Sequence, residues 1–99
     1  MLKQFELSLK FIENKDNYYA GFYAVMEHCA LALYIKNCLW DAGTIGDNEL
    51  LHYSERIHKA KRAAIETHRA WTIARLTESA SEHTIETITN SIYNDVFNL

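Results

Sequence analysis

The sequence predicts an all-α protein: a long antiparallel helical hairpin completed by shorter N- and C-terminal helices into a small helical bundle. The chain has no proline and three glycines in 99 residues, so few positions interrupt a helix. Apolar residues recur at helical spacing over two long stretches, and the turn-forming segment AGTIGDN separates them. A chain of this length forms one domain, so residues 1–99 are expected to be a single helical domain.

The first segment, residues 2–13, fits two secondary structures. Its apolar residues alternate as in a strand at Phe5, Leu7, Leu9 and Phe11. They also follow helical spacing at Leu2, Phe5, Leu9 and Ile12. The leucine, lysine, glutamine and glutamate content favours a helix, and a lone strand would leave its backbone hydrogen bonds unsatisfied. A helix is therefore expected, with a strand as the alternative.

A second helix is expected from about Tyr18 to Asp41. It follows the polar break NKDN, in which Asp16 or Asn17 is placed to cap its first turn. Apolar side chains occupy most of its circumference and leave only a narrow polar face. Such a helix should be covered by neighbours on more than one side.

The segment AGTIGDN is the clearest turn in the chain. Gly43 can adopt the left-handed conformation that ends a helix, and Thr44 with Asp47 resembles a capping pair for the next one. A third helix is expected from about Asp47 to Glu78, antiparallel to the second. Its packing face contains Leu50, Tyr53, Ile57, Ala60, Ala64, Thr67, Trp71 and Ala74. The alanines allow a neighbouring helix to approach closely.

A last helix of about sixteen residues is expected at the C-terminus. Ser79 or Ser81 can cap its first turn. Its apolar residues are Ile85, Ile88, Ile92 and Val96, which recur every three or four positions.

The overall charge argues against two classes of partner. A net charge of −3 and an isoelectric point near 5.9 disfavour attraction of the whole molecule to nucleic acid or to an anionic membrane. The most apolar stretch carries Glu27 and His28 at its centre, where a bilayer-spanning helix tolerates them least. The first residues do not have the pattern of a secretory signal. No association with a membrane is expected.

The two cysteines indicate a reducing compartment. Cys29 and Cys38 lie on the same expected helix, about 13 Å apart along its axis. A disulfide needs Cα atoms within about 7 Å, so the two thiols cannot pair with each other. Two buried free thiols are typical of a cytoplasmic protein.

The segment HYSERIHKAKRAAIETHRAW, residues 52–71, is rich in histidine but lacks the spacing of a metal site. Zinc ligands on one helix are about three or four residues apart, and His52, His58 and His68 do not follow that spacing. Glu55 and His58 form one Glu-x-x-His pair, the half-motif that di-iron bundles use twice, and a second pair is missing. Neither a metal nor another cofactor is expected.

The sequence RAAIETH within this segment is similar to the arginine–histidine spacing of HEPN-type ribonucleases. The resemblance implies a small helical bundle that dimerises and in which Arg62 and His68 act on the scissile phosphate and the 2′-hydroxyl of RNA. It covers seven of the 99 residues, and Ala63 stands where the family commonly has a polar residue. The alternative is that Arg62 pairs with Glu66 while His68 flanks the packing face.

Two lines of charged residues run along the third helix. The outer line alternates in sign, and ion pairs are expected between Glu55 and Lys59 and between Arg62 and Glu66. The inner line, beside the packing face, carries no acid and consists of Ser54, Lys61, His68 and Arg75. Arg56 lies on the opposite side of the packing face. These basic residues are expected to meet acids on a neighbouring helix or another protein, with nucleic acid as the alternative.

The chain has more apolar surface than a two-helix hairpin can bury. The outer face of the third helix turns apolar at Ile73 and Leu76, and the second helix is apolar almost all round. The first and last helices or another chain must cover these residues, and a homo-oligomer is expected.

No conventional catalytic set accompanies these features, so the favoured function is non-enzymatic. We expect a small cytoplasmic protein-binding module, an adaptor, regulator or inhibitor of a larger protein, of a kind common among phage and mobile-element proteins. The residues expected to contact the partner are Tyr18, Tyr19, Arg56, Lys61, His68 and Arg75. A HEPN-like ribonuclease and a nucleic-acid-binding helical protein are the alternatives.

Overall fold

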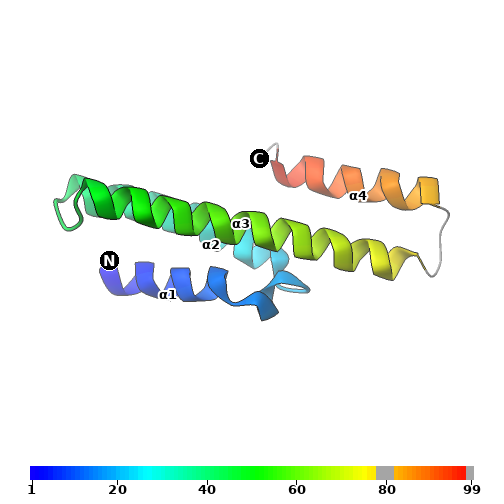
Figure 1. Cartoon of the computed structure of the whole chain (residues 1–99), viewed down its shortest axis with the longest axis horizontal. Helices are drawn as coiled ribbons and strands as arrows, with labels where there is room; N and C mark the ends of the chain where they lie inside the picture. The colour runs from blue at the N-terminus through cyan, green and yellow to red at the C-terminus, as the bar shows by residue number, and fades with distance from the viewer. Residues whose placement is uncertain (78–81, 98–99) are drawn as a thin grey trace.

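The computed structural model describes the backbone of residues 1–77 and 82–97 and the side chains of residues 1–77 and 86–94. These residues are helical and include no strand, as the sequence predicts. The elements are α1 (Leu2–Glu13), a short 3-10 helix η1 (Lys15–Tyr18), α2 (Phe22–Asp41), α3 (Asp47–Leu76) and α4 (Glu82–Phe97). Each α-helix runs antiparallel to the one before it (Figure 1).

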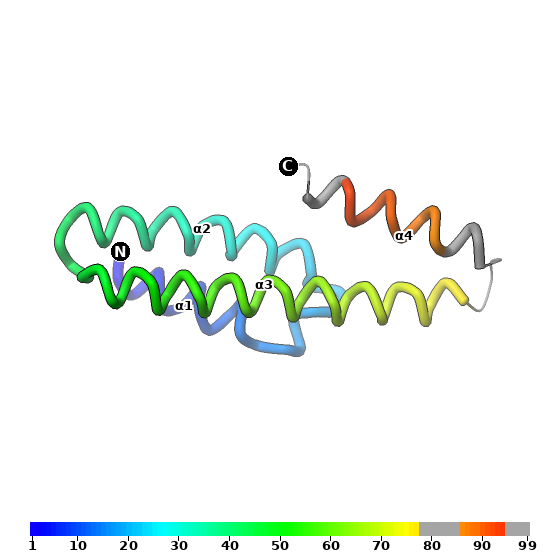
Figure 2. Tube along the Cα trace, turned by 45° about the horizontal axis from the view of Figure 1, so that its top comes forward, coloured from blue at the N-terminus to red at the C-terminus, as the bar shows by residue number. Residues whose placement is uncertain are grey.

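The molecule is elongated around the hairpin of α2 and α3. α1 lies along one side of this hairpin, and α4 lies on the other side near the far end of α3 (Figures 1 and 2). The molecule measures 53 × 24 × 18 Å. Its Cα radius of gyration is 15.9 Å, whereas a compact domain of this length has about 13 Å. The C-terminal end of α3, beyond His68, therefore lies outside the three-helix core that α1, α2 and the rest of α3 form.

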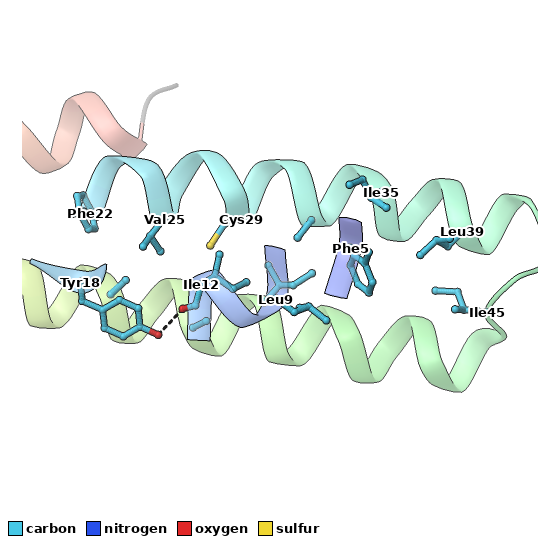
Figure 3. Close-up of a cluster of buried hydrophobic side chains, with 14 of the residues drawn as sticks. Phe5, Leu9, Ile12, Tyr18, Phe22, Val25, Cys29, Ile35, Leu39 and Ile45 are labelled. Carbon is cyan, nitrogen blue, oxygen red and sulfur yellow. Dashed lines mark hydrogen bonds between the residues drawn. The ribbon is translucent and has the colours of Figure 1, made fainter. Parts of the chain in front are cut away.

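The first segment is a helix, so the strand alternative is wrong. Phe5, Leu9 and Ile12 are spaced along one face and are buried against α2 and α3 (Figure 3). The ring of Phe5 meets that of Tyr53 edge-on, with centroids 4.9 Å apart. Ser8 lies on this face as well and is buried, and its hydroxyl forms a 3.3 Å hydrogen bond with Nδ1 of His28 on α2. The helix thus satisfies its backbone internally and buries its apolar face.

The second helix begins at Phe22, four residues later than the sequence indicates. The chain first turns through η1, which is capped by the side chain of Asn14 and not by Asp16 or Asn17. The two predicted caps fail because Asp16 and Asn17 lie within η1 itself, and α2 begins only at Phe22, with Gly21 as its N-cap. Gly21 then lies so close to the preceding turn that an added Cβ would stand 3.0 Å from the Asn17 carbonyl oxygen. The backbone needs a glycine here to turn from η1 into α2.

The turn between α2 and α3 forms where the sequence predicts, but with different capping. Gly43 adopts the predicted left-handed conformation, with φ of 74°. The capping pair of Thr44 and Asp47 does not form, because Gly46 is the N-cap and its N–H donates to Glu49 Oε1 at 3.2 Å. Asp47 instead accepts a 2.8 Å hydrogen bond from the indole N–H of Trp40. This bond ties the end of α2 to the start of α3.

In the antiparallel hairpin, each residue of α2 lies opposite the residue of α3 for which the two residue numbers add up to 90. Phe22 stacks on His68 with ring centroids 4.2 Å apart, and Lys36 Nζ donates to Ser54 Oγ at 2.7 Å. Both pairs are equally distant from the turn, as an antiparallel register requires. Ala60 is buried among them, consistent with the predicted close approach of the helices.

The packing face of α3 differs from the predicted one at its C-terminal end. Thr67 and Trp71 are only half-buried and Ala74 is exposed, whereas His68 is buried. The reason is that α2 begins level with His68, so it does not cover the next turns of α3.

The last helix is present, but isoleucines do not form its buried face. Thr89 and Tyr93 are buried against α3, Ile88 is exposed and Ile92 is half-buried. The predicted caps Ser79 and Ser81, together with the side chains of residues 85 and 96, lie outside the described residues.

Replacing Phe5 with alanine should destabilise the protein strongly. Its side chain is completely buried, and such truncations cost about 3–5 kcal/mol, which is a large share of the stability of a small domain. Leu7 lies on the same helix but is 57% exposed, so its replacement by alanine should change stability by less than about 0.5 kcal/mol. Urea unfolding followed by circular dichroism measures both. Equal effects of the two substitutions would show that α1 does not pack as described.

Candidate functional site

The inner line of α3, predicted to meet a partner, instead faces α2 over most of its length. Ser54, Lys61 and His68 are seven residues apart, and so are the α2 residues opposite them. These are Phe22, Cys29 and Lys36, which satisfy the same register sum of 90. The expected counterparts were acids, and this prediction is wrong for these three positions. Only Arg75 lies beyond the start of α2 and remains exposed.

Lys36 and Lys61 bring two ammonium groups into the hairpin interface. Lys36 is 7% exposed and donates to Ser54 Oγ, which in turn donates to the Leu50 carbonyl oxygen at 2.8 Å. Lys61 is half-buried and close enough to Cys29 to favour its thiolate. Burial outweighs this attraction and raises the pKa of the Cys29 thiol to about 11. Cys29 is therefore a protonated, unreactive thiol at neutral pH.

His68 is a core residue and not an exposed contact, which corrects the prediction that it faces a partner. Its ring lies between α2 and α4, stacked on Phe22, and its Nδ1 is 2.9 Å from the hydroxyl of Tyr93. Trp71 and Tyr23 also contact the ring edge-on or tilted, with centroids 5.5 and 6.2 Å away. Burial lowers the pKa of His68 from its ordinary 6.5.

Arg56 finds its acid on a neighbouring helix of the same chain, which is one of the two counterparts that the sequence left open, and not on a partner. Its Nε donates to Glu13 Oε2 at 3.1 Å and its Nη2 to Oε1, so the guanidinium and the carboxylate pair through two bonds. These bonds to Glu13 raise the pKa of Arg56 further above its ordinary value. The guanidinium also lies 5.9 Å from the Tyr53 ring centroid. Arg56 thus fastens the end of α1 to α3 within one chain.

Tyr18 and Tyr19 are adjacent but differ completely in environment. Tyr18 is 3% exposed, and its hydroxyl donates to the Ile12 carbonyl oxygen at 2.7 Å (Figure 3). Tyr18 was expected to contact a partner, but η1 turns its ring into the core, where a partner cannot reach it. Tyr19 is 42% exposed and leans toward α3.

Tyr19, Trp71 and Arg75 form an exposed group that we call the distal cluster. The rings of Tyr19 and Trp71 meet edge-on with centroids 6.0 Å apart, and the Arg75 guanidinium lies 4.6 Å above the Trp71 ring. Tyr19 and Trp71 border a shallow depression that also includes Glu66, Thr67 and Ala70. The cluster therefore combines two aromatic rings with a cation on the part of α3 that α2 does not cover.

The outer line of α3 does not form the predicted ion pairs. Among the described residues the ion pair found is that of Arg56 with Glu13, and neither Glu55 with Lys59 nor Arg62 with Glu66 makes one. Exposed pairs of this kind gain little, so the side chains stay solvated.

The described residues form neither a ribonuclease site at Arg62 and His68 nor a metal site at Glu55 and His58. Arg62 is exposed whereas His68 is buried, so they do not meet at a surface where a phosphate could contact both. His58 is exposed, and the described part of the chain holds no group of three or more histidine, cysteine or carboxylate side chains that could bind a metal.

Comparisons with known proteins were made at three levels. No family model, curated protein or solved structure matches the chain. Within the described residues, no helix is both long and apolar enough to cross a membrane. Function therefore has to be inferred from the surfaces of the molecule itself.

Basic residues are concentrated on α3. Residues 56–75 contain six of the ten lysines and arginines but only one of the thirteen acids. The remainder of the chain is correspondingly acidic, which the net charge of −3 conceals. The distal cluster lies at the end of this basic segment, where it favours a partner that carries negative charge.

Sequence reasoning missed a groove between α2 and α3. It encloses about 390 Å³ and is lined by Tyr23, Met26, Glu27, Cys29, Ala30, Leu33 and Lys61. The register of the hairpin was the signal that could have found it. Counting outward from the turn places Lys61 opposite Cys29, and the α2 residues on the adjoining face are apolar.

His68 should make stability depend on pH. Because its pKa is lower in the folded protein than in the unfolded chain, the unfolded chain takes up the proton first as the pH falls. The contribution of neutral His68 to stability is complete above about pH 6.5 and is lost progressively below it. In the wild type, the urea midpoint of unfolding should decrease as the pH is lowered from about 8 to about 5.

The matched variants are His68→Phe and His58→Gln. Phenylalanine keeps the stacking on Phe22 but cannot titrate, so that variant should lose part of the pH dependence. His58 is exposed, and its replacement should leave the pH dependence unchanged. If the His68→Phe curve paralleled that of the wild type, His68 would not be held neutral by burial.

Proposed function

We propose that this chain is a small non-enzymatic protein-binding module of the cytoplasm, which acts as a homo-oligomer and regulates, inhibits or adapts a larger protein. The distal cluster carries the proposal. Tyrosine, tryptophan and arginine are the residues that contribute most binding energy at protein interfaces. Here they are held against one another before any partner arrives. The free thiols Cys29 and Cys38 support the cytoplasmic setting.

The side chains of the distal cluster are already restrained, which favours a high affinity for a partner. Binding normally costs about 0.5–1.5 kcal/mol for each flexible side chain that becomes immobilised. Trp71 is already restrained on both sides, by Tyr19 and by Arg75. A partner that covers it therefore loses less of its binding energy to ordering these side chains.

The chemistry of the cluster indicates what it would bind. Arg75 is exposed, and the structure gives it no acid among the described residues, so a carboxylate of the partner can reach its guanidinium. The adjacent depression, with Ala70 between the Trp71 ring and Thr67, suits a small apolar side chain. The expected partner element presents an apolar residue beside an acid.

Nucleic acid is the second candidate, favoured by the basic segment of residues 56–75. Phosphate binding would make the affinity fall steeply as salt is added, because each neutralised phosphate releases counterions. A titration with single-stranded and double-stranded RNA at two salt concentrations distinguishes the two functions. Weak binding that does not respond to salt would leave the protein-binding proposal in place.

The proposal predicts that a partner contacts position 19. A photo-cross-linking amino acid in place of Tyr19, expressed in the native cells, should capture a protein larger than the chain itself. Adding Arg75→Glu should reduce capture by about tenfold or more, because a charge reversal repels the partner's acid. The captured protein is then identified by mass spectrometry.

Two controls decide the outcome. The same amino acid at Leu7, which is exposed on α1 away from α3, should capture nothing specific. Arg62→Ala should leave capture unchanged, since Arg62 is exposed on a different face of α3. Equal capture from positions 7 and 19, or capture indifferent to Arg75→Glu, would contradict the proposal. RNA cleavage by the purified protein that Arg62→Ala abolishes would favour the ribonuclease instead.

A further inference from the structure

A second apolar surface runs along α2 on the side away from α1. We call it the α2 strip, and its apolar members are Tyr23, Met26, Ala30, Leu33, Tyr34 and Trp40, while the exposed polar residues Asn37 and Asp41 lie on the same side near its C-terminal end. At 100° per residue these positions fall within about one third of the helix circumference. α4 reaches only the first turn of α2, where the ring of Tyr93 lies 6.0 Å from that of Phe22, and α1 and α3 pack along other sides of α2. Beyond that first turn, no described helix covers the strip.

The exposure of the strip is large for a monomer. Tyr23 is 55% exposed, Tyr34 is 68% exposed and Trp40 is 44% exposed. The chain as a whole exposes 6682 Å², whereas a compact monomer of 11.5 kDa exposes about 5,800 Å². The surplus of about 900 Å² is close to the 800 Å² or so that each partner contributes to a stable interface. One additional protein surface of ordinary size would bury it.

Besides Asp41 at its C-terminal end, the α2 strip is bordered by an acid and a base. Glu27 is exposed on α2, and Lys61 is half-buried on α3, across the groove that lies between them. Within the described residues neither of the two forms an ion pair. In a two-fold symmetric interface, a residue that contacts another receives the same contact in return. An acid and a base on one face can therefore each pair with the opposite charge of an identical face.

We propose that a second copy of this chain binds the α2 strip, in a two-fold symmetric dimer that pairs Glu27 of each copy with Lys61 of the other. The inference rests on the homo-oligomer of the proposed function and names its surface. Both copies bury Tyr23, Met26 and Leu33 in the centre of the interface. The two ion pairs at its edges select the antiparallel arrangement of the copies. The distal cluster stays free for the larger partner.

Charge reversal tests the dimer directly. Glu27→Lys alone places two like-charged pairs in the interface and should raise the dissociation constant on the order of 100-fold, and Lys61→Glu alone should do the same. The double variant Glu27→Lys/Lys61→Glu restores two attractive pairs and should recover dimerisation. Sedimentation equilibrium over a concentration series follows the mass, which should be twice 11.5 kDa for the wild type and the double variant.

Two further variants separate loss of the interface from loss of the fold. Ala30→Arg puts a charged side chain at an exposed position in the middle of the strip, so it should give a folded monomer. Glu55→Lys makes the same charge change as Glu27→Lys, but on the outer face of α3, and should remain dimeric. Circular dichroism checks that each variant keeps its helices.

Several results would overturn the inference. A wild type that stays monomeric throughout the series would mean that something other than a second copy covers the strip. A dimer indifferent to both single reversals and to Ala30→Arg would have its interface elsewhere. The purified protein is used without any partner, so these results do not depend on capture through position 19. Arg75→Glu should abolish capture and leave the mass unchanged.

Discussion

The length difference between α2 and α3 determines how the rest of the chain is arranged. α3 has 30 residues and α2 has 20, and because Phe22 lies opposite His68, about 12 Å of α3 extends past the start of α2. α1 covers the paired end of the hairpin, and α4 packs on the unpaired end. Because α1 and α4 each cover a different end of the hairpin, two apolar surfaces stay uncovered. One is the α2 strip, and the other is the part of α3 around Trp71. The elongated shape and the surplus of exposed surface both follow from this arrangement.

The hairpin depends on polar contacts as well as apolar ones. The heptad line of Phe22, Cys29 and Lys36 faces that of Ser54, Lys61 and His68, and three of these six side chains are basic. A buried lysine costs free energy that an apolar residue of similar size would not, so Lys36 adds little to stability. Its effect is on register, since sliding the helices by one turn would leave the buried ammonium without the Ser54 hydroxyl. The same register places Lys61 at the groove and His68 against Phe22.

The sequence was sufficient for the helices but not for the direction in which their side chains point. Apolar spacing and the turn at Gly43 predict four helices and a hairpin, because these signals are local. The environments of Tyr18 and His68 were predicted wrongly, since they depend on the 3-10 turn and on where α2 begins. Neither is encoded in helical periodicity. For Arg56 the sequence left open whether the acid lies on a neighbouring helix or on a partner, because that choice depends on how α1 packs beside α3. The apolar pattern of the second helix indicated cover on more than one side, but it could not say which side the short helices leave open.

The central claim is that the α2 strip is an interface between two copies, distinct from the distal cluster. Isotope-filtered nuclear Overhauser spectroscopy on an equal mixture of labelled and unlabelled chains measures contacts between copies only. The account predicts contacts between copies from the Met26 methyl and the Leu33 methyls to the Tyr23 and Tyr34 rings. Signals from Tyr19 and Trp71 should show contacts within one chain alone. Contacts between copies confined to Trp71 or Ile73, or none at concentrations where the protein is a dimer by mass, would contradict it.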